Sequence, residues 1–352
     1  MDPSRPRATL AAVAAAVGVS RTTVSNAYNR PDQLSAALRE RILAAAAELG
    51  YHGPDPVARS LRMRTASAVG LVFGDSLSRA FVDPNAVEFL QGMARACEDT
   101  GRSLLLVPAG PEATNTDTVQ RAAVDGFVVY SLPPNDQHLA AVRTRPQPIV
   151  IVDSPRDVPD IDFVGVDDRV GFAKITHHVL GLGHRRIAFL VASVTGVWSD
   201  TPDVVSVAER DVGVLGERAR GMQDEIGAAD VQVSVWDCRA SAPDMGAAAA
   251  REALAADPRP TAVMCFSDAL ALGALQAAAD LGLRVPEDVS VTGFDDVPAA
   301  AAAGLTTVRQ PTPEKGQRAV ALLDKPAVDG RRVVELPTNL IVRGSTGPAR
   351  DD

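Results

Sequence analysis

The sequence predicts a chain of two unlike parts: a small all-α unit at the N-terminus, then a larger α/β region of two lobes in which parallel sheets are flanked by helices. Residues 9–50 show apolar side chains at helical spacing, with capping residues and glycines at the expected ends. From about Ser67, apolar runs of strand length alternate with helical stretches in two consecutive sets. At 352 residues the chain is long enough for both parts.

The first predicted helix begins after Thr9, whose hydroxyl can accept hydrogen bonds from the free N–H groups of the first turn. It ends at Gly18, because glycine readily adopts the positive φ that a tight turn needs. Ser20 then caps a second helix, which runs from residue 21 to about residue 29.

The second helix has an apolar side, formed by Val24 and Ala27, and a polar side. The polar side chains near its N-terminus are Arg21, Thr22, Ser25 and Asn26. Two short helices joined by a tight turn form a helix-turn-helix, whose second helix enters the major groove of DNA and meets the base edges. The alternative, an alanine-rich bundle without a partner, is disfavoured by this polar face.

A third helix is predicted after the cap Ser35, with Gly50 as its left-handed C-terminal residue. Its apolar residues recur every three or four positions: Leu38, Ile42, Ala45, Ala46 and Leu49. Nine arginines against five acidic residues leave a net charge of +4 on residues 1–65, and since the whole chain carries −9, the remainder carries −13. A basic end on an acidic body favours nucleic-acid contact at that end only.

The remainder contains two sets of apolar runs that we expect to be buried parallel strands, with helices such as 87–100 between them. The first set is AVGLVF (68–73), SLLLVP (103–108), GFVVYS (126–131), PIVIVD (148–153) and FVGVDD (163–168). The second set is RIAFLVA (186–192), VSVWDC (233–238), AVMCFSD (262–268) and DVSVTGFDD (288–296). Two such sets predict two similar lobes, with a ligand cleft at the carboxyl ends of the strands.

Distinctive motifs occur along nearly the whole chain. In the first 65 residues they are VSRTTVSNAYN, LSAALRERILAAAAELGY and ARSLR. Further along they are VDGFVV, GLGHRRIAFL, ERARGM, SDALALGAL, VPEDVSVTGFDD and LTTVRQP. Together these motifs resemble those of the LacI/GalR family of bacterial transcription regulators. The resemblance implies a DNA-binding headpiece followed by a sensor that is similar to a periplasmic sugar-binding protein.

The resemblance also implies the domain limits. They are a helix-turn-helix domain over 1–52, a hinge over 53–65, an effector-binding and dimerisation domain over 66–347, and a tail over 348–352. Within the sensor, the N-lobe would comprise about 66–166 and 311–333, and the C-lobe about 167–310 and 334–347.

The family's DNA contacts carry over residue by residue. The resemblance implies base contacts from Arg21, Thr22 and Asn26, and phosphate contacts from Thr9, Ser20, Thr23, Ser25 and Ser35. In the hinge, Leu61 matches a leucine that wedges into the minor groove, and Ala58 allows the two hinge helices of a dimer to approach. An ordinary flexible linker is the alternative for this segment.

For the effector site the resemblance implies Asp153, Arg218, Asp295 and Gln310, whose polar groups suit sugar hydroxyls. Ser267 stands where an asparagine is frequent in the family. From the residues alone we add Asp75, which ends the first strand. Of the aromatic candidates Phe81, Trp198, Trp236 and Phe294, we expect Phe81 and Trp236 to form cavity walls. The alternative for Arg218 with Asp295 is a structural salt bridge at the lobe junction.

Enzyme and metal functions find little support. His177, His178 and His184 do not have metal-ligand spacing on one helix face, and no GxGxxG, Walker, GxSxG or CxxC motif occurs. We therefore expect no catalytic residue, no metal and no cofactor. Cys97, Cys238 and Cys265 are expected to be buried thiols, and a cytoplasmic location is expected because the chain opens without a signal peptide and has no membrane span.

The function predicted is that of a repressor that binds a pseudo-palindromic operator as a homodimer, with a tetramer left open, and whose DNA affinity changes when a small molecule, expected to be a sugar, binds the sensor. Two alternatives remain at this point. One is a corepressor-type regulator that responds to a purine or nucleoside, and the other is a ligand-binding enzyme with a vestigial headpiece.

Overall fold

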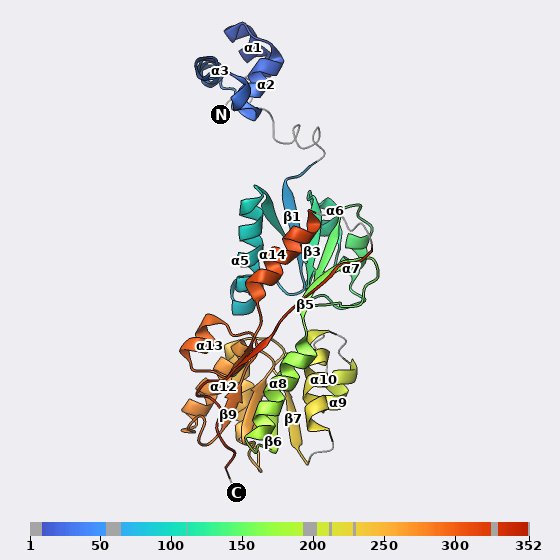
Figure 1. Ribbon diagram of the computed structural model, residues 1–352, viewed down its shortest axis with the longest axis vertical. Helices are drawn as coiled ribbons and strands as arrows, with labels where there is room; N and C mark the ends of the chain where they lie inside the picture. The colour runs from blue at the N-terminus through green and yellow to red at the C-terminus, as the bar shows by residue number, and fades with distance from the viewer. Residues whose placement is uncertain are drawn as a thin grey trace. The chain divides into compact units, whose positions relative to one another are not determined.

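The computed structural model describes residues 9–53, 65–110, 112–192, 203–210, 213–227, 230–324 and 330–350 (Figure 1). The chain divides into two compact units, residues 1–66, here called the headpiece, and residues 67–352, here called the body. The expected hinge contacts Ala58 and Leu61 lie outside the described residues.

The headpiece contains the three predicted helices. They are α1 (Leu10–Val17), α2 (Arg21–Asn29) and α3 (Ala36–Glu48), with a 3-10 turn, η1 (Pro31–Gln33), before α3. The three predicted caps are confirmed, since the hydroxyls of Thr9, Ser20 and Ser35 accept from backbone N–H groups three residues further on at 3.2, 3.0 and 3.3 Å. Gly18 and Gly50 adopt left-handed φ angles of 74° and 70°, as predicted.

A small apolar core holds the three helices together. Its buried members are Val13, Ala14, Val24, Ala27, Ile42 and Ala46. Tyr28 and Tyr51 close it with an edge-to-face contact at 5.9 Å between ring centroids. The prediction is wrong for Leu49, which is 43% exposed, because α3 ends at Glu48 and the side chain of its C-cap no longer points toward the core.

The N-lobe of the body is built around a six-stranded parallel sheet. Its strands are β1 (Ala68–Phe73), β2 (Ser103–Pro108), β3 (Gly126–Tyr130), β4 (Ile149–Val152), β5 (Asp162–Val166) and β11 (Val333–Leu336), in the order β11-β5-β4-β3-β1-β2. Its helices are α5 (Pro84–Asp99), α6 (Asp117–Arg121), α7 (Gln137–Arg143) and α14 (Thr312–Leu323), and a 3-10 turn, η2 (Arg79–Phe81), precedes α5.

Helices α5 and α14 pack against each other and, together with strands of this sheet, enclose an apolar core (Figure 1). Glycine allows their close crossing, because a Cβ on Gly92 would lie 2.0 Å from the carbonyl oxygen of Pro313 and one on Gly316 would lie 2.5 Å from that of Phe89. The start of α14 is thereby held firmly against the rest of the N-lobe.

The C-lobe contains a four-stranded parallel sheet in the order of its strands β7 (Gln232–Asp237), β6 (Arg186–Val191), β8 (Ala262–Cys265) and β9 (Ser290–Thr292). Its helices are α8 (Asp168–Gly181), α9 (Val204–Arg210), α10 (Val214–Ile226), α11 (Pro243–Leu254), α12 (Asp268–Asp280) and α13 (Pro298–Ala302). A short antiparallel pair, β10 (Thr307–Arg309) and β12 (Asn339–Ile341), completes it.

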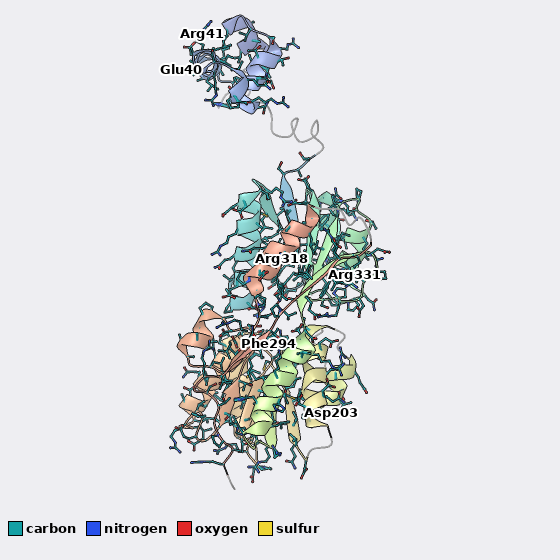
Figure 2. All side chains as sticks on the ribbon, viewed as in Figure 1. Glu40, Arg41, Asp203, Phe294, Arg318 and Arg331 are labelled. Atoms are coloured by element: carbon teal, nitrogen blue, oxygen red, sulfur yellow. The ribbon has the colours of Figure 1, made fainter. Side chains whose placement is uncertain are left out.

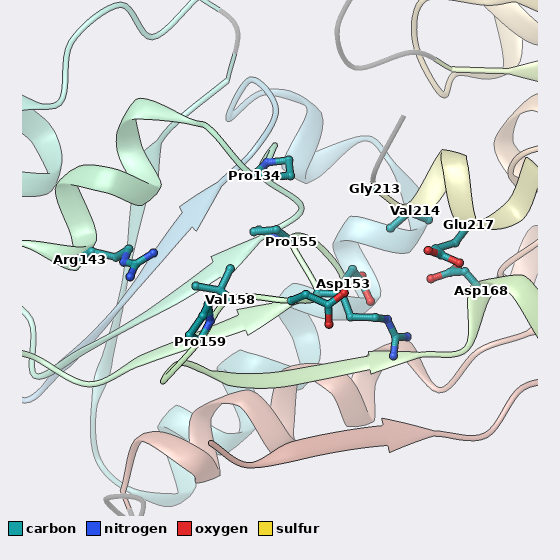
Figure 3. Close-up of a pocket in the computed structure, with 12 residues that line it drawn as sticks. Pro134, Arg143, Asp153, Pro155, Val158, Pro159, Asp168, Gly213, Val214 and Glu217 are labelled. Atoms are coloured by element: carbon teal, nitrogen blue, oxygen red, sulfur yellow. The ribbon is translucent and has the colours of Figure 1, made fainter. Parts of the chain in front are cut away.

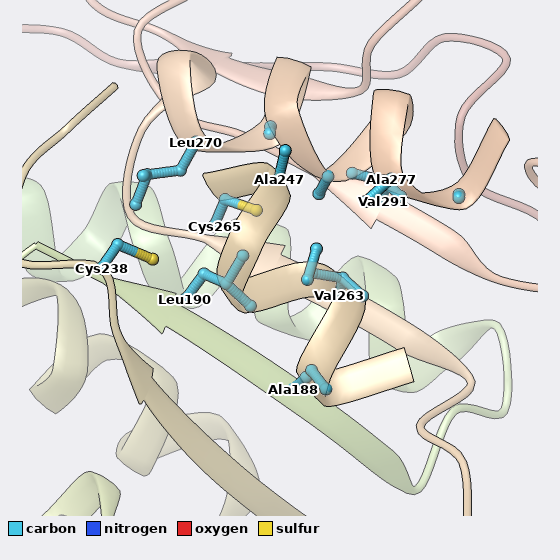
Figure 4. Close-up of a cluster of buried hydrophobic side chains, with 14 of the residues drawn as sticks. Ala188, Leu190, Cys238, Ala247, Val263, Cys265, Leu270, Ala277 and Val291 are labelled. Carbon is cyan, nitrogen blue, oxygen red and sulfur yellow. The ribbon is translucent and has the colours of Figure 1, made fainter. Parts of the chain in front are cut away.

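Two apolar layers sandwich this second sheet. One is an alanine-rich core with α11 and α12, which includes the buried thiols of Cys238 and Cys265 (Figure 4). The other, with α8 and α10, contains Phe172, Phe189 and Phe294. Cys97 is buried in the N-lobe, so all three cysteines are buried as predicted.

All nine predicted strands are present, but two corrections apply. β2 and β7 are edge strands and are not buried throughout; Leu105 of β2, for example, is 39% exposed. The expected switch of lobes at 333/334 falls inside β11, which pairs with β5 of the N-lobe, so the chain returns to the C-lobe only after Leu336. Apolar runs of three or four residues were too short to reveal β10, β11 and β12.

The chain passes between the lobes three times, after β5, after β10 and after β11. Within the described parts of the chain, none of the helices combines the length and apolar character needed to cross a bilayer.

Candidate functional site

The first candidate site is the polar face of α2. Arg21 and Thr22 are exposed, and within the described part of the headpiece neither side chain has a hydrogen-bond partner. Asn26 is half-buried, and its Nδ2 donates to Oε1 of Gln33 at 3.1 Å. A guanidinium and a hydroxyl in the first turn and an amide one turn further along thus lie on one short helix, and these groups can read base edges.

The hydroxyls predicted to contact phosphates gather at helix N-termini. Thr9, Ser20 and Ser35 accept from backbone N–H groups as caps, which leaves their hydroxyl protons able to donate. The hydroxyls of Ser20 and Thr23 lie 2.8 Å apart, and Ser25 Oγ accepts from Asn29 at 3.1 Å. Free N–H groups and the positive end of each helix dipole favour phosphate at the same places.

The second candidate site is a cavity of about 300 Å³ between the two lobes of the body, here called the cleft cavity. It lies at the carboxyl ends of the parallel strands, as predicted, because its walls come from the loops that follow these strands. Six of the eight predicted effector residues line it: Asp75, Asp153, Arg218, Ser267, Asp295 and Gln310.

Two predicted residues do not line the cleft cavity. Phe81 is 63% exposed on η2, and Trp236 packs on the alanine-rich core while its Nε1 donates to Ser234. Both predictions are wrong for the same reason: on a strand or turn, the direction of a side chain depends on register, which aromatic content does not reveal.

The aromatic wall is formed instead by Phe73, Tyr130 and Phe266. Tyr130 ends β3, and its ring stacks on Phe89 at 4.3 Å while Asn85 donates to its hydroxyl at 3.3 Å. Burial raises the pKa of Tyr130 well above its ordinary value, so its hydroxyl stays neutral. The rule that selected Asp75, a position at the end of a predicted strand, would also have found Tyr130.

Arg218 on α10 is buried at the base of the C-lobe wall. It donates to Asp168 Oδ1 at 2.9 Å and to the carbonyl oxygen of Phe266 at 2.5 Å, and its guanidinium lies 3.6 Å from the ring centroid of Phe294. Asp295 is further away, at 4.0 Å. The salt bridge considered above is present at 4.0 Å, but it does not join the lobes, because Asp295 and the nearer partner Asp168 both belong to the same lobe as Arg218.

Burial raises the pKa of Asp168, with Arg218 opposing the shift, and raises the pKa of Asp295 well above its ordinary value. Phe294, under the guanidinium, lies at the end of the C-lobe that faces the N-lobe (Figure 2). An arginine between a carboxylate and aromatic rings is fixed in direction, so its remaining N–H groups are preorganised for a ligand.

A buried lysine, which the sequence analysis did not find, lies behind the lining of the cleft cavity and holds two of its polar side chains. Lys315 Nζ donates to both carboxylate oxygens of Asp153 and to Gln310 Oε1, each at 2.8 Å, and Gln310 Nε2 donates to Asp295 Oδ1 at 2.6 Å. At the rim of the cleft cavity, Arg79 pairs with Asp75 at 2.9 Å and donates to the carbonyl oxygen of Ser241 on the opposite lobe.

A second cavity of about 310 Å³ adjoins the first and shares four lining residues with it: Pro134, Asp153, Gly213 and Val214. Figure 3 shows this side chamber, with Arg143 of α7 at one end and Glu217 of α10 at the other. The cleft is thus longer than the cleft cavity alone.

No group of His, Cys, Asp and Glu side chains in the described residues could hold a metal ion. His184 is buried, and its ring nitrogens bond Thr261 at 2.9 Å and Ser290 and the carbonyl oxygen of Gly347 at 3.0 Å. It anchors the C-terminal segment through the bond to Gly347.

Comparison with known proteins supplies the family. "Bacterial regulatory proteins, lacI family" matches residues 9–54, and "Periplasmic binding protein-like domain" matches residues 176–346. An HTH-type transcriptional regulator of Mycolicibacterium smegmatis is 46% identical, with 97% of each chain covered.

Two solved structures are similar over 97% of this chain and 100% of theirs. One is a complex of the transcriptional regulator CelR with cellobiose, at 30% identity and a TM-score of 0.67. The other is the lac repressor dimer bound to operator and the anti-inducer ONPF, at 25% identity and a TM-score of 0.75. The chain therefore belongs to the LacI family of bacterial regulatory proteins, and it is a DNA-binding transcriptional regulator.

Proposed function

We propose that this regulator is a repressor whose affinity for its operator changes when a sugar binds in the cleft cavity. The observation that carries the proposal is the cavity itself, which is lined from both lobes by acceptor and donor side chains and by aromatic rings. Its volume of about 300 Å³ is at the small end of the usual ~300–1,000 Å³ range, which suits a compact ligand.

The lining favours a polyhydroxylated ring. Each sugar hydroxyl both donates and accepts, and the cavity offers carboxylate oxygens on Asp75 and Asp153 as acceptors and N–H groups on Arg218 as donors. Tyr130 and Phe266 offer apolar surface for the C–H face of a ring. The cellobiose complex of the structural neighbour CelR supports the same class of ligand.

On the DNA side, we propose that Arg21, Thr22 and Asn26 read bases. The phosphate contacts would come from hydroxyls at or near the helix starts, Thr9, Ser20, Thr23 and Ser35, and from Ser25 in the middle of α2. Asn26 would exchange its bond to Gln33 for a base, at little cost since both side chains are accessible. Such contacts require the same compartment as the chromosome, so the proposed location is the cytoplasm.

A homodimer would present two headpieces to two half-sites, as a pseudo-palindromic operator requires. The lac repressor neighbour is a dimer on its operator. In this chain the free edge of β2 offers half-exposed Leu104 and Leu106 and exposed Leu105, which favours an apolar contact between copies.

Sugar binding would close the lobes, and closure would change the separation of the two headpieces. Affinity for DNA can change only by the difference in sugar binding free energy between the two arrangements. We propose release of the operator on sugar binding; stronger binding with a purine is the alternative outcome.

Operator binding titrated against a panel of sugars and nucleobases tests this proposal. A tenfold change in operator affinity corresponds to about 1.4 kcal/mol of coupling and identifies the effector class. The double variant Arg21→Ala/Asn26→Ala should lose the operator and keep sugar binding. A chain that protects no palindromic site, or protects one equally with every compound, contradicts the proposal.

A further inference from the structure

Lys315 stands at a position that the helical pattern reserves for an apolar side chain. The buried face of α14 consists of Thr312, Gly316, Ala319, Val320 and Leu323. Lys315 lies on the same face, is 1% exposed, and directly precedes Gly316, which packs closely against α5. Burying an ammonium ion costs free energy unless it is paired and hydrogen-bonded, so a lysine here needs a reason other than packing.

All three protons of the ammonium group are used. Two go to the carboxylate oxygens of Asp153 and one to Gln310 Oε1, each at 2.8 Å. Because lysine only donates, the oxygen of the Gln310 amide must face Lys315, and its NH₂ group then faces Asp295. Lys315 itself does not line the cleft cavity, so it acts on a ligand through Asp153 and Gln310.

The pairing leaves the cleft cavity with its ionised side chains compensated from within the protein. Asp153 is paired with Lys315, Arg218 with Asp168, and Asp75 with Arg79. Asp295 lies 4.0 Å from Arg218 and accepts from Gln310, and Asp83 accepts from the backbone N–H of Asn85 as the N-cap of α5; burial raises the pKa values of both. Arg239 lines the cavity too, but its side chain is exposed to water at the rim, where solvent screens its charge.

A charged ligand would therefore find no buried counter-charge that lacks a partner among the described lining residues, and it would still lose its hydration. A neutral ring with the same hydroxyl groups loses much less, since each hydroxyl can replace its water contacts by bonds to the lining side chains.

We propose that Lys315 is a specificity-determining residue of the effector site: by neutralising Asp153 and fixing the Gln310 amide, it makes the cavity select a neutral polyhydroxylated ring over an amine or acid of the same ring. This proposal rests on the proposed function, because it concerns the ligand of the same cavity.

The experiment uses the full-length chain without DNA and measures ligand-induced thermal stabilisation and affinity by calorimetry. The probes are two matched triplets: glucose, glucosamine and glucuronate, and galactose, galactosamine and galacturonate. We expect the wild-type chain to bind a neutral member more tightly than both charged members of its triplet. A wild-type chain that prefers a charged member, or that no neutral member stabilises at any soluble concentration, overturns the proposal.

In Lys315→Met, Asp153 becomes an unpaired buried carboxylate, and the ratio of amino-sugar to neutral-sugar affinity should rise by about tenfold or more. Asp153→Asn/Lys315→Met removes both charges and should return the ratio toward the wild-type value. Leu323→Ala, on the same buried face but far from the cavity lining, should lower the melting temperature and leave the ratio unchanged. An unchanged ratio in a folded Lys315→Met chain, or a double variant that stays amine-selective, contradicts the proposal.

The DNA experiment separates this proposal from the proposed function. A chain that prefers neutral sugars but whose operator affinity ignores them keeps the role of Lys315 and loses the regulatory proposal. A chain whose operator affinity responds only to a charged sugar keeps the regulatory proposal and loses the role of Lys315.

Discussion

The polar face of α2 and the cleft cavity both present polar side chains, but the two regions satisfy them in opposite ways. On α2, Ser20 bonds a backbone N–H three residues away and Asn26 a side chain seven residues away. In the cavity, Arg218 pairs with a carboxylate 50 residues away, and Lys315 with one 162 residues away. The DNA-reading face is complete once local helices form, whereas the cavity exists only when the whole body has folded.

This difference implies different costs of mutation. A polar group on the exposed face can return to water when its partner is removed, so function changes while stability hardly does. A polar group in the cavity cannot return to water, so removal of its partner leaves it buried and unpaired. The following predictions test this contrast, from the largest expected effect to the smallest.

Arg218→Ala should lower the free energy of unfolding of the body by about 3–5 kcal/mol, because Asp168 is left buried without its cation, and it should also abolish sugar binding. Arg169→Ala is the matched control, since the Arg169–Asp224 pair has equally good geometry but half-exposed side chains. Its removal should cost at most about 1 kcal/mol. Urea unfolding followed by circular dichroism measures the free energy of unfolding of both variants. Equal losses in the two variants would contradict the expected difference between buried and exposed ion pairs.

Asp268, a buried carboxylate, should make the stability of the body depend on pH. Its buried carboxylate accepts from Thr307 at 2.6 Å and from the backbone of Val297 at 2.9 Å, and burial raises its pKa to about 6. Since the folded chain holds this proton more tightly than the unfolded chain, stability should fall as pH rises from the ordinary value of 3.8 through about 6.

Urea midpoints at pH about 5 and about 7 measure this fall, and Asp268→Asn should make it smaller. Asp288 is the control: its hydrogen bond from Arg284 lowers its pKa to about 2, so Asp288→Asn should not alter the difference between the two pH values. A wild-type midpoint that is higher at pH about 7 than at pH about 5 would show that the buried carboxylate does not behave in this way.

Arg21→Ala should weaken operator binding by about 1–3 kcal/mol and leave the melting temperature unchanged, because the side chain is exposed. Arg41→Ala on α3 removes the same charge from another exposed position of the headpiece (Figure 2) and should weaken binding far less. Fluorescence anisotropy with a footprinted operator and a scrambled duplex measures both. Equal effects on the two duplexes would make Arg21 a phosphate contact.

Ser20→Ala should lower the stability of the headpiece by about 1 kcal/mol, because the cap bond from the backbone N–H of Thr23 is lost. Thr22→Ala, two residues further along α2, removes an exposed side chain for which the described headpiece shows no hydrogen bond, and it should leave helix stability unchanged. Hydrogen exchange at the amides of α2 compares them. Slower or equal exchange in Ser20→Ala would mean that the cap does not hold this helix.

Sequence patterns predicted the elements better than the directions of their side chains. All nine strands and the helical caps follow from local patterns, since hydrophobic spacing and capping chemistry act over a few residues. Phe81 and Trp236 were misplaced, and Tyr130 was missed, because which face of a strand or turn borders the cavity depends on sheet order. The pairing of Lys315 could not be predicted for the same reason: its partner Asp153 directly follows β4 of the N-lobe, which is distant in sequence.

By itself, the sequence determined that this chain has a three-helix DNA-reading unit and two α/β lobes, because apolar periodicity, caps and glycines specify structure locally. The tertiary structure alone decided which of the predicted side chains meet, that Arg218 pairs with Asp168, and that a buried lysine neutralises Asp153. The physical reason is that buried charges need partners at hydrogen-bond distance, and only the folding of distant strands and helices brings such partners together.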